Sequence, residues 1–175
     1  MARVSLTPEV IDGIVAGLRA RAGWRGPDDS TEGTTVYDGP EFTTTDATHP
    51  DGFVVIGYGG EDLDDREGDP DDAMSGEVNV AAMATTSPKD VSDEIECAAW
   101  FGLGSVDVSG ARSAVFAIVD DFDTWLRANA RATVAPGSGA QVNHVQVTGT
   151  SLRQYIRDGG SRASVRFTIR LQSRT

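Results

Sequence analysis

The sequence predicts an α+β domain in which two main helices pack on one face of a mixed, largely antiparallel β-sheet. Apolar residues recur at helical spacing in two segments, residues 7–23 and 109–129. About six other segments have the alternating or continuously apolar pattern of strands. Asp158-Gly159-Gly160, between the last two of these segments, is a hairpin signal and favours antiparallel pairing there.

The first helix is expected to begin at Thr7-Pro8-Glu9, which offers a capping residue, a proline suited to the first turn and an acidic side chain near the positive end of the helix dipole. Its apolar stripe consists of Val10, Ile11, Ile14, Val15 and Leu18. Gly13 and Gly17 would leave a smooth patch for another backbone to approach, although simple tolerance of glycine explains them equally well. Gly23 is the expected C-terminal cap.

The second helix is expected to begin with Ser109 as its cap and to end near Asn129. Its buried face is predicted to contain Val115, Ile118, Val119, Phe122 and Leu126. The three aspartates within 120–123 should mostly face away from the core, and Arg127 lies near the negative end of the helix dipole.

The six expected strands are Thr35–Asp38, Phe53–Tyr58, Gly76–Thr85, Asp93–Phe101, Gln141–Tyr155 and Ser161–Gln172. The Phe53–Tyr58 segment is continuously apolar and predicts a buried strand. The Gly76–Thr85 segment would form a hairpin with the following strand across residues 87–90, but its alanines are equally compatible with a helix. In the last strand apolar residues alternate with arginines and small polar residues, so one face should be packed while the other is solvated or contacts a partner.

Composition excludes several classes of function. The 175 residues predict a single domain, 1–175, with no internal repeat. The net charge of −12 argues against general affinity for nucleic acid, which requires lysine and arginine to neutralise phosphates. No segment approaches the roughly 20 consecutive apolar residues of a membrane span, and no signal peptide is recognisable, so a cytoplasmic product without membrane partners is expected. Cys97 is the only cysteine and should behave as a small apolar residue.

A mobile acidic loop is expected at about residues 59–77. This segment contains nine acidic residues and one basic residue, Arg66, so its local charge is −8. The candidate functional acids are Glu61, Asp62, Asp64, Asp65, Glu67, Asp69, Asp71 and Asp72. Specific calcium binding is disfavoured, because in an EF-hand loop that begins at Asp65 the position that requires glycine is Pro70 and the position that requires glutamate is Gly76. A plain solvated loop and a functional electrostatic surface both remain compatible with this composition.

The C-terminal segment, residues 153–174, has the opposite charge, because six arginines and one aspartate give +5. The candidate contact residues are Arg153, Arg157, Arg162, Arg166 and Arg170. In a head-to-tail ring these arginines could pair with the acidic segment of an identical neighbour. They could equally offset charge within one subunit or remain solvated.

The sequence offers no recognisable active site, and no cofactor or metal is expected. His49 and His144 are the only histidines, and they have neither the spacing of zinc ligands nor a serine in a G-x-S-x-G turn. Gly57-Tyr58-Gly59-Gly60 leads into the acidic segment, which would repel a phosphate. The sequence therefore predicts a protein that is not an enzyme.

Five short blocks occur in a fixed order along the chain. They are Val36-Tyr37-Asp38-Gly39-Pro40, Asp51-Gly52-Phe53-Val54-Val55-Ile56-Gly57-Tyr58, Cys97-Ala98-Ala99-Trp100-Phe101-Gly102, Val147-Thr148-Gly149-Thr150-Ser151-Leu152-Arg153-Gln154 and Ala163-Ser164-Val165-Arg166-Phe167-Thr168-Ile169. With one helix before the first block and another between the third and fourth, this order resembles the tail terminator (tail completion) proteins of long-tailed phages of actinobacteria. The resemblance covers roughly residues 4–171.

The resemblance implies a structural subunit of the virion, assembled in the host cytoplasm. Such proteins form hexameric rings at the head-proximal end of the tail tube, end its polymerisation and present the surface on which the head docks. The implied partners are further copies of the chain, the tail tube protein and a head-completion or stopper protein, while double-stranded DNA passes through the ring without specific binding. The acidic segment is then expected at the lumen or at the rim that faces the tube. The alternatives are another neck or tail-tube ring protein and, in a different class, a small cytoplasmic enzyme or ligand-binding protein.

Overall fold

The computed structural model describes residues 7–39, 52–58, 90–129, 141–157 and 160–174. In sequence order its elements are α1 (Thr7–Arg19), β1 (Trp24–Arg25), β2 (Thr34–Asp38), β3 (Phe53–Ile56), β4 (Asp90–Leu103), α2 (Val108–Asn129), β5 (Gln141–Arg157) and β6 (Gly160–Arg174). Within these ranges the strands form one six-stranded sheet in the order β1-β2-β3-β4-β6-β5. The predicted α+β class is confirmed.

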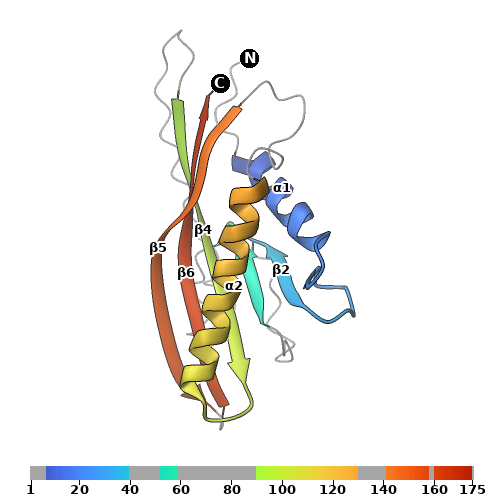
Figure 1. Cartoon of the computed structure of the whole chain (residues 1–175), viewed down its shortest axis with the longest axis vertical. Coiled ribbons are helices and arrows are strands. Elements are labelled where there is room, and N and C mark those ends of the chain that lie inside the picture. Colours follow the sequence, from blue (N-terminus) through green and yellow to red (C-terminus); the bar gives the residue numbers. More distant parts are fainter. Residues whose placement is uncertain (1–6, 40–51, 59–89, 130–140, 158–159, 175) are drawn as a thin grey trace, which may run out of the picture.

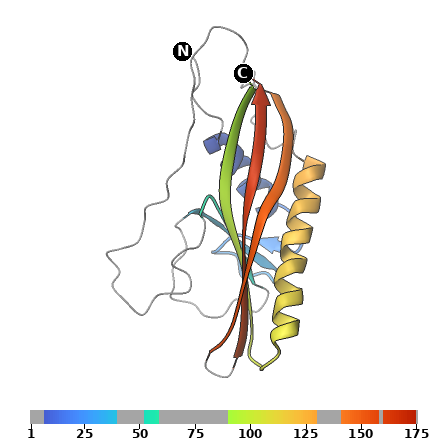
Figure 2. The same ribbon diagram turned by 90° about the vertical axis from the view of Figure 1, so that its left-hand side faces the viewer.

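The sheet is mixed. The pairs β1/β2 and β2/β3 are parallel, whereas β3/β4, β4/β6 and β5/β6 are antiparallel. The strands β4, β6 and β5 form a tall twisted blade, and α2 runs along one side of it (Figures 1 and 2). The last strand of the sequence, β6, therefore lies between β4 and β5 and pairs with both.

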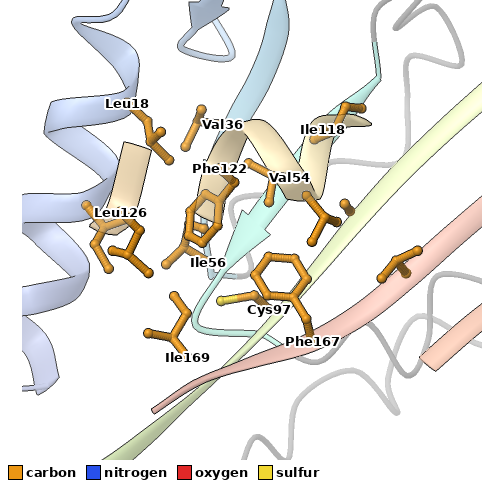
Figure 3. Packing of buried hydrophobic residues seen from close by; sticks show 14 of the residues in the cluster. Leu18, Val36, Val54, Ile56, Cys97, Ile118, Phe122, Leu126, Phe167 and Ile169 are labelled. Atoms are coloured by element: carbon orange, nitrogen blue, oxygen red, sulfur yellow. The ribbon is translucent and has the colours of Figure 1, made fainter. Parts of the chain in front are cut away.

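Both helices pack on the same face of the sheet, as predicted. The apolar stripes of α1 and α2 share one core with alternate residues of the strands, including Val54 and Ile56 of β3 and Phe167 of β6 (Figure 3). All five residues predicted for the buried face of the second helix are buried. Phe122 of α2 and Phe167 lie with their ring centroids 5.3 Å apart near the middle of this core.

A second, smaller cluster lies on the opposite face of the sheet. The intervening β3 residues, Phe53 and Val55, join Tyr37 of β2 there, and Tyr58 and Trp100 pack against them. All four residues of β3 are consequently buried, which confirms the prediction of a buried strand for this apolar run. The strand ends at Ile56 and not at the predicted Tyr58, because Gly57 follows with a φ of 79°, which is outside the range of a strand.

The helix ends differ from the predictions in two places. Asp107, and not Ser109, caps α2: its Oδ1 accepts a hydrogen bond from the Gly110 N–H at 2.8 Å, and its carbonyl accepts one from the Ala111 N–H. Helix α1 ends at Arg19, so Gly23 is not its C-terminal cap. Gly23 instead uses its φ of 83° in the turn that leads into β1, where its carbonyl accepts a hydrogen bond from the Thr34 N–H.

One aspartate of α2 does not simply face solvent. Asp121 accepts hydrogen bonds from Arg21 at 2.6 Å and from the Trp24 indole at 2.8 Å, and so joins the segment after α1 to α2. Asp120 is exposed as expected, and Asp123 pairs with Arg127 one turn later at 2.7 Å.

Gly17 is a point of close contact between the helices. A Cβ added at this position would lie 2.6 Å from Cζ2 of Trp125 in α2, so the absence of a side chain makes room for an indole ring. The neighbour is a side chain and not the backbone that the sequence suggested.

The short strand β1 was not predicted, because two residues in a turn-rich segment leave no periodic pattern. Arg19 lies beside this end of the sheet, where its Nε and Nη2 both donate to the carbonyl of Val36, at 3.1 and 2.9 Å. The long strands extend beyond their predicted ends, and β5 pairs with β6 as the hairpin signal predicted. The strand predicted at Gly76–Thr85, its hairpin and the acidic loop at 59–77 lie outside the described residues.

Candidate functional site

The candidate site is the face of the blade that points away from the helices. Val165, Phe167 and Ile169 of β6 face the core, so the alternate residues of the same strand face outward. The sheet register places Ser164 between Trp100 of β4 and Arg153 of β5. Arg162 and Arg166 lie on either side of Ser164 along β6 and also face outward. Arg170, four residues after Arg166, faces the same way.

The structure thus brings Arg153, Arg162, Arg166 and Arg170 onto one face, which we call the arginine face. Arg157 lies in β5 opposite Gly160, and its side chain is outside the described residues. The sequence predicted the shared face of Arg166 and Arg170. Alternation along β6 places Arg162 on the same face, and the pairing of β5 with β6 adds Arg153.

Arg170 forms an ion pair within its own subunit. Its Nη2 lies 2.6 Å from Oε1 of Glu94, directly across the β4/β6 pair, and both side chains are about half exposed. A surface pair of this kind contributes little to stability, about 0–1 kcal/mol. The intrasubunit interpretation of the basic segment therefore holds for this residue.

Arg162 lies over an aromatic cluster. Its guanidinium carbon is 5.9 Å from the centroid of the Trp100 ring, a cation–π geometry. Trp100 in turn stacks on Phe53 at 5.2 Å, and Tyr37 meets Phe53 edge-on at 5.7 Å. This cluster was not predicted from the sequence. The signal for it was the buried strand itself, in which the neighbours Phe53 and Val54 must face opposite sides of the sheet, so that both sides are packed.

A second feature is the edge of the sheet formed by β5. Among the described residues β5 pairs with β6 alone, and the strand is 17 residues long. Two irregularities in the β5/β6 register, at Val142/His144 and Thr148/Ser151, divide it. Beyond the second irregularity the stretch Ser151–Arg157, which we call the β5 edge, pairs with β6 without interruption.

Two of the three most exposed large apolar side chains in the described ranges belong to the β5 edge, and the third lies in the turn between β4 and α2. They are Val106, at 65% exposure, Ile156, at 55%, and Leu152, at 36%. Val106 lies in the turn between β4 and α2, and Ser161 holds this turn through hydrogen bonds to the carbonyls of Ser105 and Asp107. Since Ile156 is the cross-strand partner of Ser161, its side chain and Val106 lie at the same end of the blade.

The remaining candidates for chemistry have ordinary environments where they are described. His144 is exposed, with Nε2 3.0 Å from Oε1 of Gln146, and His49 lies outside the described residues. Cys97 is fully buried, and burial raises the pKa of its thiol to about 12. The described ranges contain no group of three or more histidine, cysteine, aspartate or glutamate side chains suited to hold a metal ion.

The acidic residues predicted as functional, Glu61 to Asp72, lie outside the described residues, so the structure does not place them relative to the arginine face. No helix among the described residues is long and apolar enough to cross a membrane. A scan against models of known protein families and a search of curated proteins both found no match to this chain.

Proposed function

We propose that this protein is a structural subunit of the phage head-to-tail joining complex, a tail terminator that assembles into a ring on the head-proximal end of the tail tube. In this role it ends tube polymerisation and provides the docking surface for the head. Its partners are further copies of itself, six in a closed ring, the tail tube protein and a head-completion or stopper protein. Its place is in the virion, after assembly in the host cytoplasm.

The observation that supports this proposal best is where the five sequence blocks fall in the fold. The blocks coincide with β2, β3, β4, β5 and β6, which are consecutive members of one sheet except for the exchange of β5 and β6. The blocks also contain glycines with positive φ values. Gly52 and Gly57, with φ values of 78° and 79°, lie directly before and after β3, and Gly149, at the irregularity of β5, has a φ of 60°. The blocks therefore form the framework of the described sheet.

The arginine face supplies one side of the proposed subunit contact. A closed ring needs two different complementary surfaces on each subunit. Arg162 lies over Trp100 on this surface, whereas Arg170 is engaged by Glu94 of its own subunit. Because the net charge is −12, acidic residues outnumber basic ones, and a neighbouring copy has acidic side chains that can pair with this surface.

The acidic segment Glu61–Asp72 has a role in the same proposal through its charge alone. Duplex DNA carries one negative charge per ~1.7 Å of its axis, so a basic channel would retain it. Six copies of a strongly negative segment at the lumen or at the tube-facing rim would keep DNA from adhering, over about 8 Å at physiological salt.

Electron microscopy of the purified protein, alone and with the tail tube protein encoded in the same genome, tests the proposal. We expect rings with a central hole at one end of each tube, and shorter tubes as the ratio of this protein to tube protein rises. Rings along the whole tube would favour a tube protein instead. Monomers that neither bind tubes nor limit their length would contradict the proposal and favour the enzyme or ligand-binding class.

Charge reversal on the arginine face tests the subunit contact separately. Arg162→Glu should raise the protein concentration needed for ring closure by about tenfold, because it replaces an attraction to the acidic neighbour by a repulsion. Arg170→Gln is the matched control, since Arg170 pairs with Glu94 in its own subunit. Equal effects of the two variants on ring formation would show that the face is not a specific contact.

A further inference from the structure

We propose that the β5 edge, Ser151–Arg157, is a two-fold docking site for a second copy of this chain, in which two β5 strands pair antiparallel and join the two sheets. This inference goes beyond the proposed function and holds whether or not the chain also forms a ring. Among the described strands β5 is the outermost one of the blade (Figure 1). An edge strand presents backbone N–H and C=O groups with which another strand can pair. The register irregularities fall before Ser151, so the β5 edge offers a regular ladder.

The sequence of the β5 edge is complementary to itself in one register. Gln154 is the midpoint of Ser151–Arg157. With a two-fold axis at Gln154 the whole edge pairs with its own copy, because residues equally far before and after the axis lie opposite each other. Leu152 of each copy then lies opposite Ile156 of the other, so an apolar pair forms on both sides of the axis.

The row of the β5 edge that faces the helix provides the reason to dimerise. Leu152 and Ile156 lie opposite buried residues of β6, so they belong to the side of β5 that faces α2. The amide of Gln154 donates to the carbonyl of Val108 in α2, which anchors the middle of this row. Leu152 and Ile156 nevertheless remain partly exposed in the single chain. In the dimer each would cover the other, and burial of apolar surface is favourable.

The other row of the β5 edge selects the same axis. With the axis at Gln154, Arg153 of one copy lies opposite the neutral Tyr155 of the other, and the position of Arg157 lies opposite Ser151. An axis at Arg153 would place this residue opposite itself, and an axis at Tyr155 would place Arg153 opposite Arg157. Like charges directly opposite each other destabilise paired strands. The apolar row and the charged row therefore agree on one register.

Pairing of β5 with the opposite edge of a neighbouring sheet fits less well. That edge of the described sheet, β1, has two residues and offers no ladder of comparable length. A contact that uses the same edge on both subunits closes with two copies. The two-fold contact is therefore separate from the head-to-tail contacts of the proposed ring.

Cysteines introduced at the edge test the register. Residues opposite each other in an antiparallel pair have Cα atoms about 4.5–5.5 Å apart, within reach of a disulfide. Gln154→Cys should therefore form disulfide-linked dimers when copper phenanthroline is added as oxidant. Leu152→Cys alone should not, because four residues, about 13 Å of strand, separate its two copies. A mixture of Leu152→Cys and Ile156→Cys proteins should form the mixed disulfide. The wild type is the control, since its Cys97 is buried.

Analytical ultracentrifugation measures the dimer without added cysteines. We expect a monomer–dimer equilibrium between roughly 1 µM and 1 mM. Ile156→Lys places a charge in the apolar row and should raise the dissociation constant at least about tenfold. Its folded state should survive, because Ile156 is 55% exposed. Thr124→Lys adds the same charge at an exposed position of α2 and should leave the dimer unchanged.

Three results would overturn the proposal. One is the absence of a dimer over this range of concentration. Another is an equal effect of Ile156→Lys and Thr124→Lys on the dissociation constant. The third is disulfide formation by Leu152→Cys as readily as by Gln154→Cys, which would show that the copies do not meet about an axis at Gln154. Rings on tail tubes are scored separately, so failure of the two-fold contact and failure of the ring are distinguishable.

Discussion

Arg21 and Asp121 connect the two helical parts of the fold: the Arg21 guanidinium donates to the Asp121 carboxylate at 2.6 Å across 100 residues of sequence. Trp24 donates to the other carboxylate oxygen. Burial raises the pKa of Asp121, but the hydrogen bonds from Arg21 and Trp24 and the Arg21 charge outweigh it, so the pKa lies below its usual value.

This relationship predicts a pH-dependent loss of stability for Asp121→Asn. At neutral pH the variant should be less stable by about 1 kcal/mol, because it loses charge-assisted hydrogen bonds that are partly screened by solvent. Because the pKa of Asp121 is lower in the folded state than its unfolded value of about 3.9, the ionised carboxylate stabilises the folded state fully at any pH above that value. This stabilisation disappears as the pH falls through the folded-state pKa. In urea titrations the gap between wild type and variant should therefore shrink at acid pH. Asp120→Asn is the control, and a gap that does not change with pH would count against this account.

Gly17→Ala should destabilise the protein although alanine is the better helix former. The expected gain in helix propensity is about 1 kcal/mol, whereas overlap of the new methyl with the Trp125 ring should cost about 1–3 kcal/mol. In a Trp125→Ala background the same substitution should become stabilising. A double-mutant cycle of unfolding free energies measures this reversal, and strict additivity of the two changes would show that the contact is unimportant.

Gly52→Ala should destabilise the fold by about 2 kcal/mol or more, because the residue has a φ of 78° and its Cβ would lie 2.6 Å from the carbonyl oxygen of Trp100. A backbone atom cannot move aside as a side chain can. Gly104→Ala, where a Cβ has open space, should stay close to wild type in thermal unfolding. Equal stabilities of the two variants would disprove the assignment.

Cys97 should be unreactive in the folded protein. Because burial raises its thiol pKa to about 12, the thiolate is scarce at neutral pH, and the side chain is also inaccessible. Labelling by a disulfide reagent should proceed only as fast as the chain unfolds, and quickly in denaturant. Rapid labelling of the native protein, at a rate proportional to reagent concentration, would contradict this prediction.

Replacement of His49 and His144 by glutamine should leave both folding and ring assembly intact. His144 is exposed, and the hydrogen bond described for it is the one to Gln146. Replacing its ring should therefore change the free energy of unfolding by no more than about 0.5 kcal/mol. The measurements are thermal unfolding and the electron-microscopic assay with tail tubes. Loss of assembly by a variant that remains folded would point to a functional histidine.

The sequence predicted those features that depend on local periodicity. The buried face of α2 and the alternation in β6 follow directly from the 3.6-residue and two-residue repeats, and both are confirmed. The cap of α2 was assigned two residues too late, because Ser109 and Asp107 are both capable caps and only the backbone geometry selects between them.

The features that the sequence could not predict depend on contacts between distant segments. The ion pair of Arg170 with Glu94 joins residues 76 positions apart, and it requires the register of β4 against β6. The stacking of Trp100 on Phe53 beneath Arg162 depends on the same order of strands. The exposure of Leu152 and Ile156 became recognisable only when β5 was placed at the edge of the sheet.

The position of β6 between β4 and β5 also bears on the order in which the protein can fold during synthesis. Both neighbours of β6 precede it in the sequence, so they leave the ribosome before the strand that joins them. Until β6 emerges, β5 has no neighbour among the described strands, and Val165, Phe167, Ile169 and Leu171 are missing from the core. The nascent chain should thus gain resistance to proteolysis in a single late step, when β6 is released, and not gradually as it lengthens.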